Sequence, residues 1–223
     1  MQKIRRVLTA LKYPQAASAS FRLPVRVRGT PVAYLRAIPA CLGGESSCDA
    51  HLMTKWRNTH REAFFTWREW TEISMREWLA TSYGPDGEDI LFMVVTPEGR
   101  PFGHMALSNF VDEGRACEFG RVLRGSNAGP ENGMTWAASA LLHWAHSALG
   151  VERFFLEVLQ NNDRAIAMYE RLGFRVTSSV LLTRESRGAV TRWVRQRLGE
   201  SVAPDAHAYA MDVAAAKVCT PDE

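Results

Sequence analysis

Tyr169 and Asn162 are two polar side chains whose spacing indicates a shared chemical task. They are seven residues apart in a stretch that reads as a helix ending at Gly173, so they share one helix face about 10 Å apart. A phenol can donate a proton, and an amide can orient a ligand through hydrogen bonds. The sequence is equally compatible with a helix cap at Asn161 or Asn162 and a packed aromatic ring at Tyr169.

Glu118 and His104 are the side chains best placed to accept a proton. Glu118 lies on a predicted strand and shares its face with Gly120 and Val122. A carboxylate there can act as a base if desolvation raises its pKa, although a surface or ion-paired role fits the sequence as well. His104 lies on the neighbouring strand and titrates in the right range by residue type. Glu118 is therefore the preferred base and His104 the second choice.

A strand, a loop rich in Gly, Asn and Pro, and a long helix follow one another between residues 116 and 149. The helix has one apolar stripe at helical spacing, from Met134 to Leu149. A glycine-containing loop that enters a helix N-terminus favours an anion, because the free N–H groups and the helix dipole both attract negative charge. The loop has neither the Gly-Lys-Ser/Thr ending of a P-loop nor the Gly-x-Gly-x-x-Gly pattern of a dinucleotide fold.

Together these stretches resemble the GNAT superfamily of acetyl-CoA-dependent N-acetyltransferases. The pattern Asn162-x-x-Ala165-x-x-x-Tyr169-x-x-x-Gly173-Phe174 resembles the second motif of the family. The strand, loop and helix from Glu118 to Leu149 resemble its first motif, which binds pyrophosphate. The arginine usual in that motif is missing, because Gly129 stands at its position, and Arg124 is a candidate replacement.

The resemblance implies a role for each motif residue. Tyr169 would protonate the leaving thiolate, and Asn162 would hydrogen-bond the pantetheine arm of acetyl-CoA, the expected co-substrate. Backbone groups of Val122 and Leu123 would pair with that arm and polarise the thioester. The expected phosphate contacts come from Arg124, Asn132, Gly133, Met134 and Thr135, largely through backbone amides. No metal is expected.

Residues 46–82 read as helical, with breaks at Gly43-Gly44 and at residues 83–87, and they hold most of the tryptophans. Core packing accounts for most of these aromatic residues. In several GNAT branches, however, a segment like Trp56-Arg57-Asn58 lies near the acceptor, where a tryptophan face suits a sugar ring or a base. The expected acceptor-binding residues are Trp56, Arg57, Asn58 and Asn109.

Apolar runs bounded by turn residues predict a sheet, and the resemblance implies its arrangement. The predicted strands lie near residues 25–35 and at 89–96, 102–111, 116–123, 154–158, 176–183 and 206–213. The expected fold class is α/β, with a GNAT-like mixed, mostly antiparallel central sheet flanked by helices in a single domain. The stretch 184–205 would be a long loop between the last two strands. Its arginines (Arg184, Arg187, Arg192, Arg195 and Arg197) form a solvated face or attract an anionic substrate.

The expected domain boundaries are a flexible basic extension over residues 1–20, an N-acetyltransferase domain over 21–216 and a loose tail over 217–223. Residues 1–44 contain no acidic residue. Ile4, Leu8 and Leu11 can line a short amphipathic helix, followed by small residues at 16–20. A transit peptide, an over-extended start and a loose basic arm all share this composition.

Composition narrows the function class of this chain of 223 residues. A net charge of +3 is too small to indicate a nucleic-acid partner, and no apolar run has the roughly 20 residues of a membrane span. The four cysteines show neither Cys-x-x-Cys nor zinc spacing, so free thiols and a cytoplasmic location are expected. No membrane partner is expected, and a homodimer is left open.

The sequence therefore predicts an enzyme that moves the acetyl group of acetyl-CoA directly to the primary amine of a small substrate. A nucleotide-linked amino sugar is the preferred acceptor, on the resemblance of residues 56–58, 121–125 and 133–135 to that branch. Two alternatives stay open. One is acetylation of a protein N-terminus of the ribosomal-protein type, and the other is a non-catalytic acyl-CoA-binding sensor on the same fold.

Overall fold

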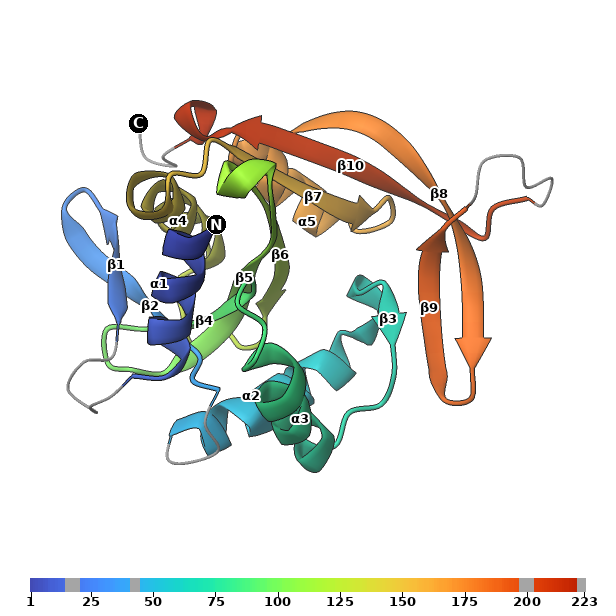
Figure 1. Ribbon diagram of the computed structural model, residues 1–223, viewed down its shortest axis with the longest axis horizontal. Coiled ribbons are helices and arrows are strands. Elements are labelled where there is room, and N and C mark those ends of the chain that lie inside the picture. The colour runs from blue at the N-terminus through green and yellow to red at the C-terminus, as the bar shows by residue number, and fades with distance from the viewer. Residues whose placement is uncertain (15–20, 41–44, 197–202, 220–223) are drawn as a thin grey trace.

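The computed structural model describes residues 1–14, 21–40, 45–196 and 203–219 (Figure 1). Within them, ten strands form one sheet in the order β1-β2-β4-β5-β6-β7-β10-β8-β9-β3. The strands are β1 (Arg22–Val27), β2 (Thr30–Ala37), β3 (Thr66–Trp67), β4 (Ile90–Val95), β5 (Pro101–Val111), β6 (Ala116–Arg124), β7 (Arg153–Leu159), β8 (Arg175–Arg187), β9 (Val190–Arg195) and β10 (Ala206–Ala214). Of the strand pairs described, only β6 and β7 run parallel. The predicted mixed, mostly antiparallel sheet is confirmed.

Helices cover both faces of the sheet, and the strand register assigns each helix to a face. The helices are α1 (Gln2–Lys12), α2 (Glu45–Thr59), α3 (Glu72–Trp78), α4 (Gly133–Trp144) and α5 (Asp163–Arg171). On β4, Phe92 packs against Trp144 of α4. Phe92 pairs with Met105 of β5, and Phe119 of β6 pairs with Leu107, two residues further along β5, so the two phenylalanines lie on the same face of the sheet. Phe119 packs against Tyr169 of α5. Helices α4 and α5 therefore cover one face together.

The opposite face carries Leu91, His104 and Glu118, because Leu91 pairs with Ala106 and Glu118 with Ser108, and both partners share the face of His104 on β5. Helices α2 and α3 cover its β4–β5 part, where Met53 and Met75 lie beside Leu91. All six residues of β4 are buried, as a strand covered on both faces requires.

Helix α5 begins and ends at the residues that the sequence indicates. The Asn162 side chain accepts a hydrogen bond from the Ala165 N–H at 3.3 Å, which caps the free first turn. Gly173 follows the helix with φ +96°, a left-handed conformation that glycine adopts without strain. A Cβ atom at Gly173 would also lie 2.7 Å from the Lys217 carbonyl oxygen.

The expectation of a flexible extension is wrong for the start of the chain, because α1 packs on the body of the protein. Ile4 and Leu8 are buried, as their amphipathic spacing allows. Lys12 is fully buried, and its ammonium donates to the carbonyl of Tyr83 at 2.7 Å and to that of Asp86. These contacts satisfy the buried charge and hold α1 in place. At the other end, Val218 is buried, so the tail does not begin at residue 217. The small-residue stretch 16–20, the break at residues 43–44, Arg197 and residues 220–223 lie outside the described residues.

The stretch expected as a long loop after residue 183 forms a β-hairpin instead. Strand β8 continues to Arg187, turns at Gly188 and pairs with β9. Strand β3 lies within the expected helical stretch 46–82 and pairs with β9. The hairpin extends from the rest of the sheet as an arm opposite β3 (Figure 1). Its base has its own small core of Leu159, Val180, Leu182 and Ala208.

No helix in the described part of the chain is long and apolar enough to cross a membrane.

Candidate active site

Strands β6 and β7 separate partway along their length. They pair only from Ala116 to Glu118 on β6, opposite Arg153 to Phe155 on β7. Both strands then continue, β6 to Arg124 and β7 to Leu159, with no further register between them in the described residues. Backbone N–H and C=O groups along this side of β6 are therefore available to a ligand.

A bulge in β6 lies at the opening between the two strands. His104 pairs with Leu123 and Ala106 with Gly120, so two steps on β5 match three on β6. Arg121 is at the bulge with φ +50°, a conformation uncommon for a residue with a side chain. The bulge turns the backbone of Val122 and Leu123 away from regular pairing, next to the opening.

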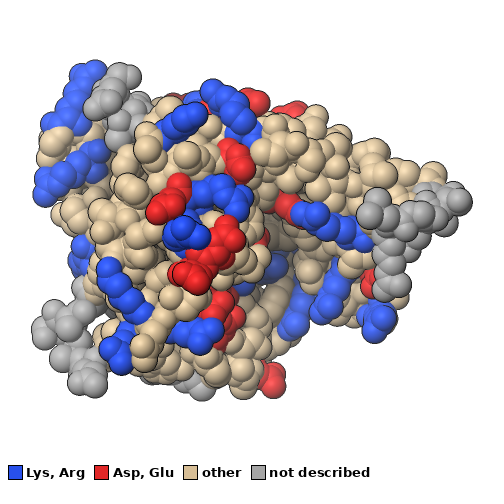
Figure 2. Space-filling view, turned by 45° about the horizontal axis from the view of Figure 1, so that its top comes forward, with Lys and Arg blue, Asp and Glu red and all other residues tan. Residues whose placement is uncertain are grey.

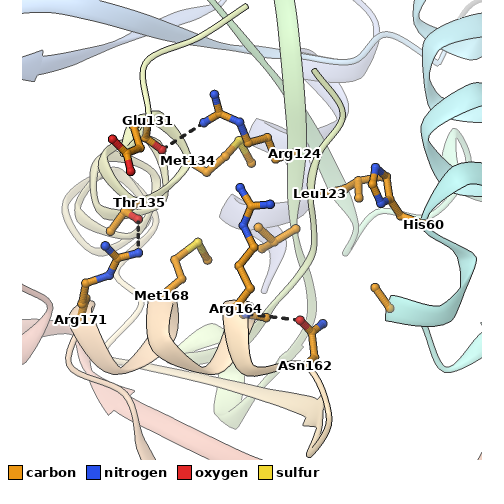
Figure 3. Close-up of a pocket in the computed structure, with 13 residues that line it drawn as sticks. His60, Leu123, Arg124, Glu131, Met134, Thr135, Asn162, Arg164, Met168 and Arg171 are labelled. Atoms are coloured by element: carbon orange, nitrogen blue, oxygen red, sulfur yellow. Dashed lines mark hydrogen bonds between the residues drawn. The ribbon is translucent and has the colours of Figure 1, made fainter. Parts of the chain in front are cut away.

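A cavity of about 210 Å³ lies between α4, α5 and the end of β6, and we call it the α4–α5 cavity (Figure 3). Its lining residues are His60, Ala63, Val122, Leu123, Arg124, Glu131, Met134, Thr135, Asn162, Arg164, Ala165, Met168 and Arg171. Arg171 extends from α5 to the start of α4, within 3.5 Å of the Thr135 hydroxyl and 3.4 Å of the Asn132 carbonyl oxygen Oδ1. The Gly133 N–H donates to the Pro130 carbonyl at 3.0 Å, but the Asn132 side chain makes no cap hydrogen bond, so the amides of Met134 and Thr135 remain available to an anion.

Arg124 and two close glycine contacts shape the loop that leads into α4. The Arg124 guanidinium donates to the carbonyls of Gly129 at 2.7 Å and Pro130 at 2.8 Å. A Cβ at Gly129 would lie 2.6 Å from the Phe102 ring, and one at Gly125 would lie 1.8 Å from the Trp56 ring. The loop therefore lies directly on two aromatic rings, which only glycine permits at these positions.

Glu118 and Tyr169 lie on opposite faces of the sheet, on either side of the opening between β6 and β7. The Tyr169 ring comes from the face covered by α5 and packs edge-on against Phe119, 6.1 Å between centroids. Burial, followed by the nearby Glu118 charge, raises the pKa of Tyr169, so its hydroxyl stays protonated. Burial also raises the pKa of Glu118, while the Arg121 charge and a hydrogen bond from Asn109 oppose that rise. The Glu118 charge therefore acts on the Tyr169 hydroxyl from the other face of the sheet.

His104 has an environment that weakens it as a base. It is fully buried under Trp56, whose ring stacks on it with centroids 6.3 Å apart. Burial, then the Arg57 charge, lowers the pKa of His104 to about 3. The imidazole is therefore neutral and weakly basic near pH 7, and the geometry favours Glu118.

A second cavity, of about 320 Å³, lies on the Glu118 side of the sheet between α2, α3 and the β8–β9 arm. We call it the arginine pocket. It is lined by Met53, Arg57, Thr66, Arg68, Trp70, Met75, Trp78, Leu91, His104, Arg121, Val190 and Arg192. Figure 2 shows the molecule hollowed between its body and the arm, with basic side chains on both sides of the hollow.

The residues expected at the acceptor have different positions in the structure. Arg57 lines the arginine pocket, and Asn109 lies beside Glu118 in a neighbouring cavity of about 460 Å³. Trp56 is only 4% exposed and supports the loop at Gly125, so its ring is not open to a sugar. Asn58 exchanges two hydrogen bonds with the backbone of Trp70, at 2.8 and 2.9 Å, and so fixes that side of the pocket.

Residues 45–175 match the Acetyltransferase (GNAT) domain family. The chain belongs to this family. As a GNAT acetyltransferase it is an acyltransferase that uses acetyl-CoA as donor, together with an acceptor substrate. No curated protein matches its sequence.

Solved structures with the same fold include GNAT proteins with different acceptors. A spermidine N-acetyltransferase from Vibrio cholerae, in complex with CoA and spermine, is 17% identical with a TM-score of 0.61, covering 83% of this chain and 96% of that one. FdhC, a nucleotide-linked sugar GNAT, is 16% identical with a TM-score of 0.62, covering 89% and 93%. RimL, a ribosomal L7/L12 α-N-protein acetyltransferase, is 12% identical with a TM-score of 0.66, covering 90% and 98%. At these identities the likeness shows the fold.

The structure also brings arginines to this GNAT site that the sequence motifs do not mark. Arg164 and Arg171 lie seven residues, or about two turns, apart on the side of α5 that lines the α4–α5 cavity, a spacing that could have indicated them. Arg68 and Arg192 come from segments more than 120 residues apart, and no local pattern connects them. Of the expected cofactor residues, all but Asn132, Gly133 and Tyr169 line the α4–α5 cavity. Asn132 contacts Arg171, and Gly133 begins α4.

Proposed function

We propose that this GNAT enzyme transfers the acetyl group of acetyl-CoA directly to the primary amine of a nucleotide-linked amino sugar, with Glu118 as the base and Tyr169 as the acid. The observation that supports the chemistry is the position of these two groups on opposite sides of the gap between β6 and β7. Burial raises the pKa of both, which suits Glu118 to accept a proton near neutral pH and keeps Tyr169 able to donate one.

The α4–α5 cavity has the chemistry to hold acetyl-CoA. Phosphate groups of the cofactor would meet the first-turn amides of Met134 and Thr135 on α4, with Arg124, Arg164 and Arg171 around them. The pantetheine arm would run along the unpaired backbone of Val122 and Leu123. The Asn162 carbonyl oxygen is used by the helix cap, so its NH₂ group is the part that can meet the arm.

Acetyl transfer then needs three proton transfers around one tetrahedral intermediate. Glu118, directly or through water, takes a proton from the acceptor ammonium, and the neutral amine attacks the thioester carbonyl. Backbone N–H groups of the bulged strand stabilise the oxyanion. When the intermediate collapses, the C–S bond breaks and Tyr169 protonates the thiolate. The attacking nitrogen then releases its second proton, which restores the Tyr169 hydroxyl as the amide forms, and the proton held by Glu118 returns to solvent.

The positive charge of the arginine pocket favours some candidate acceptors over others. Arg57, Arg68, Arg121 and Arg192 line the cavity that shares the face of Glu118. Such a surface repels a polyamine and attracts an anionic substrate. This favours the nucleotide-linked sugar over the polyamine acetylated by the Vibrio cholerae protein. The protein N-terminus, the acceptor of RimL, remains the second candidate because RimL has this fold over 90% of the chain.

Release of free CoA thiol during incubation with acetyl-CoA and an acceptor panel tests the proposal. The panel contains nucleotide-linked amino sugars, free amino sugars, spermidine and peptides with free N-termini. We expect turnover with the nucleotide-linked amino sugars. Peptide turnover alone would select the second candidate, while acetyl-CoA binding without turnover of any acceptor would indicate a sensor.

The pH dependence of kcat/KM tests the base. Because the deprotonated carboxylate is the active form, activity falls as pH drops through the Glu118 pKa, which burial places above the ordinary value of 4.5. Glu118→Gln removes this acid limb and lowers kcat by roughly 10²–10⁴-fold. Any fall in kcat/KM at low pH that comes from protonation of the acceptor amine itself remains in the Glu118→Gln variant. An acid limb unchanged in Glu118→Gln would exclude this residue as the base.

A further inference from the structure

The arginine pocket concentrates positive charge, with no acidic residue among the described residues that line it. Of its four arginines, Arg121 has a carboxylate partner, because its guanidinium holds both oxygens of Asp89 at 2.6 Å. Arg57, Arg68 and Arg192 form no ion pair with any described residue, although Glu185 lies opposite Arg192 in the pairing of β8 with β9. Two partly buried guanidiniums, those of Arg57 and Arg68, therefore face the cavity without an acidic neighbour in its described lining.

Burial makes this arrangement unfavourable without a ligand. Desolvation, followed by the charges of Arg121 and Arg68, lowers the pKa of Arg57 to about 10, yet the side chain stays charged near pH 7. Taking a cation out of water beside others costs free energy unless an anion compensates it. The desolvated cations therefore destabilise the protein, and a bound anion would offset this destabilisation.

Two of the guanidiniums stack on aromatic rings, which hold them in position, and the stacked guanidiniums cover those ring faces. Arg68 lies 3.7 Å above the Trp70 ring, and Arg57 lies 4.0 Å above the Phe64 ring. Stacking uses the guanidinium faces and leaves their N–H edges free to donate hydrogen bonds. The pocket is thereby suited to an oxyanion more than to a flat base, which would need an open ring face.

Further hydrogen-bonding groups at this pocket have no partner in the structure. Among the described residues, the buried Nε of Arg57 and Nε1 of Trp70 make no hydrogen bond. Buried donors are nearly always paired, so two at one cavity indicate a ligand that accepts from them.

The pocket also adjoins the proposed catalytic base. Arg121 lines it, and the Arg121 charge acts on both Glu118 and His104. His104 and Glu118 lie on the same face of the sheet. An anionic group in the pocket would therefore belong to a molecule whose other end can reach Glu118.

We propose that the arginine pocket is a phosphate-binding subsite for the acceptor, in which Arg57, Arg68, Arg121 and Arg192 hold a phosphoryl group while the amine lies at Glu118. The inference rests on the proposed function in one respect, the assignment of the phosphoryl group to the acceptor. Binding of a phosphate compound to the pocket is independent of turnover.

Calorimetric titration of the CoA-saturated protein with inorganic pyrophosphate, uridine diphosphate and uridine tests the site. Saturation with CoA blocks the α4–α5 cavity, so any remaining phosphate site lies elsewhere. We expect the two diphosphates to bind and uridine not to bind. Loss of one charge-assisted contact in Arg192→Gln, whose side chain is exposed and not needed for folding, should weaken both diphosphates about tenfold. Arg68→Gln gives a second measurement.

Arg22→Gln is the matched control, because it removes the same charge from an exposed position on β1, far along the sheet. It should leave diphosphate binding unchanged. No diphosphate binding to the CoA-saturated protein would overturn the proposal, and so would equal weakening in Arg22→Gln and Arg192→Gln. Uridine binding as tightly as its diphosphate would instead assign the pocket to the base.

Steady-state kinetics separates this inference from the proposed function. If a nucleotide-linked amino sugar is acetylated, Arg192→Gln should raise its KM about tenfold with a much smaller change in kcat, and should change the KM of the free amino sugar far less. An equal effect on both acceptors would show that the pocket does not bind the acceptor phosphate. If the protein binds diphosphates but acetylates no amino sugar, the pocket is a phosphate-binding site and the proposed amino-sugar acceptor is wrong.

Discussion

Arginines line both the α4–α5 cavity and the arginine pocket, but their partners differ in the two places. In the α4–α5 cavity, Arg124 donates to loop carbonyls and Arg171 contacts Thr135, so these cations also build the walls that they line. In the arginine pocket, Arg57 and Arg68 stack on aromatic rings and keep N–H groups unused. A hydrogen-bonded arginine shapes a site before the ligand arrives, whereas a stacked arginine keeps its donors for the ligand.

The two cavities also differ in how the chain builds them. The α4–α5 cavity is formed mainly by residues 122–171, which follow one another along the strand, loop and helices of the two motifs. The arginine pocket combines α2, β3 and the segment after it, the β6 bulge and the β8–β9 arm. We therefore expect substitutions in the first cavity to affect the common donor and those in the second to affect acceptor choice.

Tyr169→Phe should have the largest effect, because it removes chemistry and leaves both cavities intact. If the phenol protonates the thiolate, kcat should fall by roughly 10²–10⁴-fold, while CoA affinity and pyrophosphate affinity stay near wild type. Single-turnover kinetics together with calorimetry measures the two separately. The ring remains packed against Phe119, so the thermal midpoint reports whether the fold is intact. Wild-type turnover in this variant would remove Tyr169 from the acid role.

Arg171→Gln should have an intermediate effect restricted to the donor. The side chain is exposed, so salt and water screen part of its attraction to phosphate, and we expect the Kd of acetyl-CoA to rise about tenfold. Diphosphate binding to the arginine pocket should not change once CoA is saturating. The comparison between the cavities would fail if Arg171→Gln and Arg192→Gln weakened the same ligand. Arg175→Gln, four residues beyond α5 at the start of β8, is the charge-matched control.

Substitutions of Asn162 should have the smallest effect, and two of them distinguish its role as a helix cap from its role in acetyl-CoA binding. Asn162→Ala removes the cap and should destabilise the protein by about 1 kcal/mol, lowering the thermal midpoint by about 2–4 °C. Asn162→Asp keeps a cap oxygen but loses the NH₂ group, so it should retain stability and weaken acetyl-CoA binding. Equal stability loss in the two variants would mean that the cap bond at Ala165 is not the source of the effect.

Sequence patterns were most informative where function depends on neighbours along the chain. The helix from Asn162 to Gly173, with its cap and left-handed end, is present as predicted, because those signals act within one or two turns. The loop into α4 was recognisable for the same reason. The β8–β9 hairpin was missed, because its charged sequence resembles a solvated loop and its pairing with β3 joins segments far apart. Helix α1 was expected to be loose, because composition does not reveal that Lys12 finds buried carbonyls on a distant turn.

By itself the sequence indicated the family, the order of strands and helices between residues 89 and 183, and the helix that carries Asn162 and Tyr169, since all of these depend on residue types at short, fixed spacings. Only the tertiary structure distinguishes the environments of Glu118 and His104, because desolvation and neighbouring charge set the basicity of each side chain and the sequence shows neither. Tertiary structure alone also brought Arg68 and Arg192 into one pocket. Charge clusters of this kind form through the folding of distant segments, and no local pattern records them.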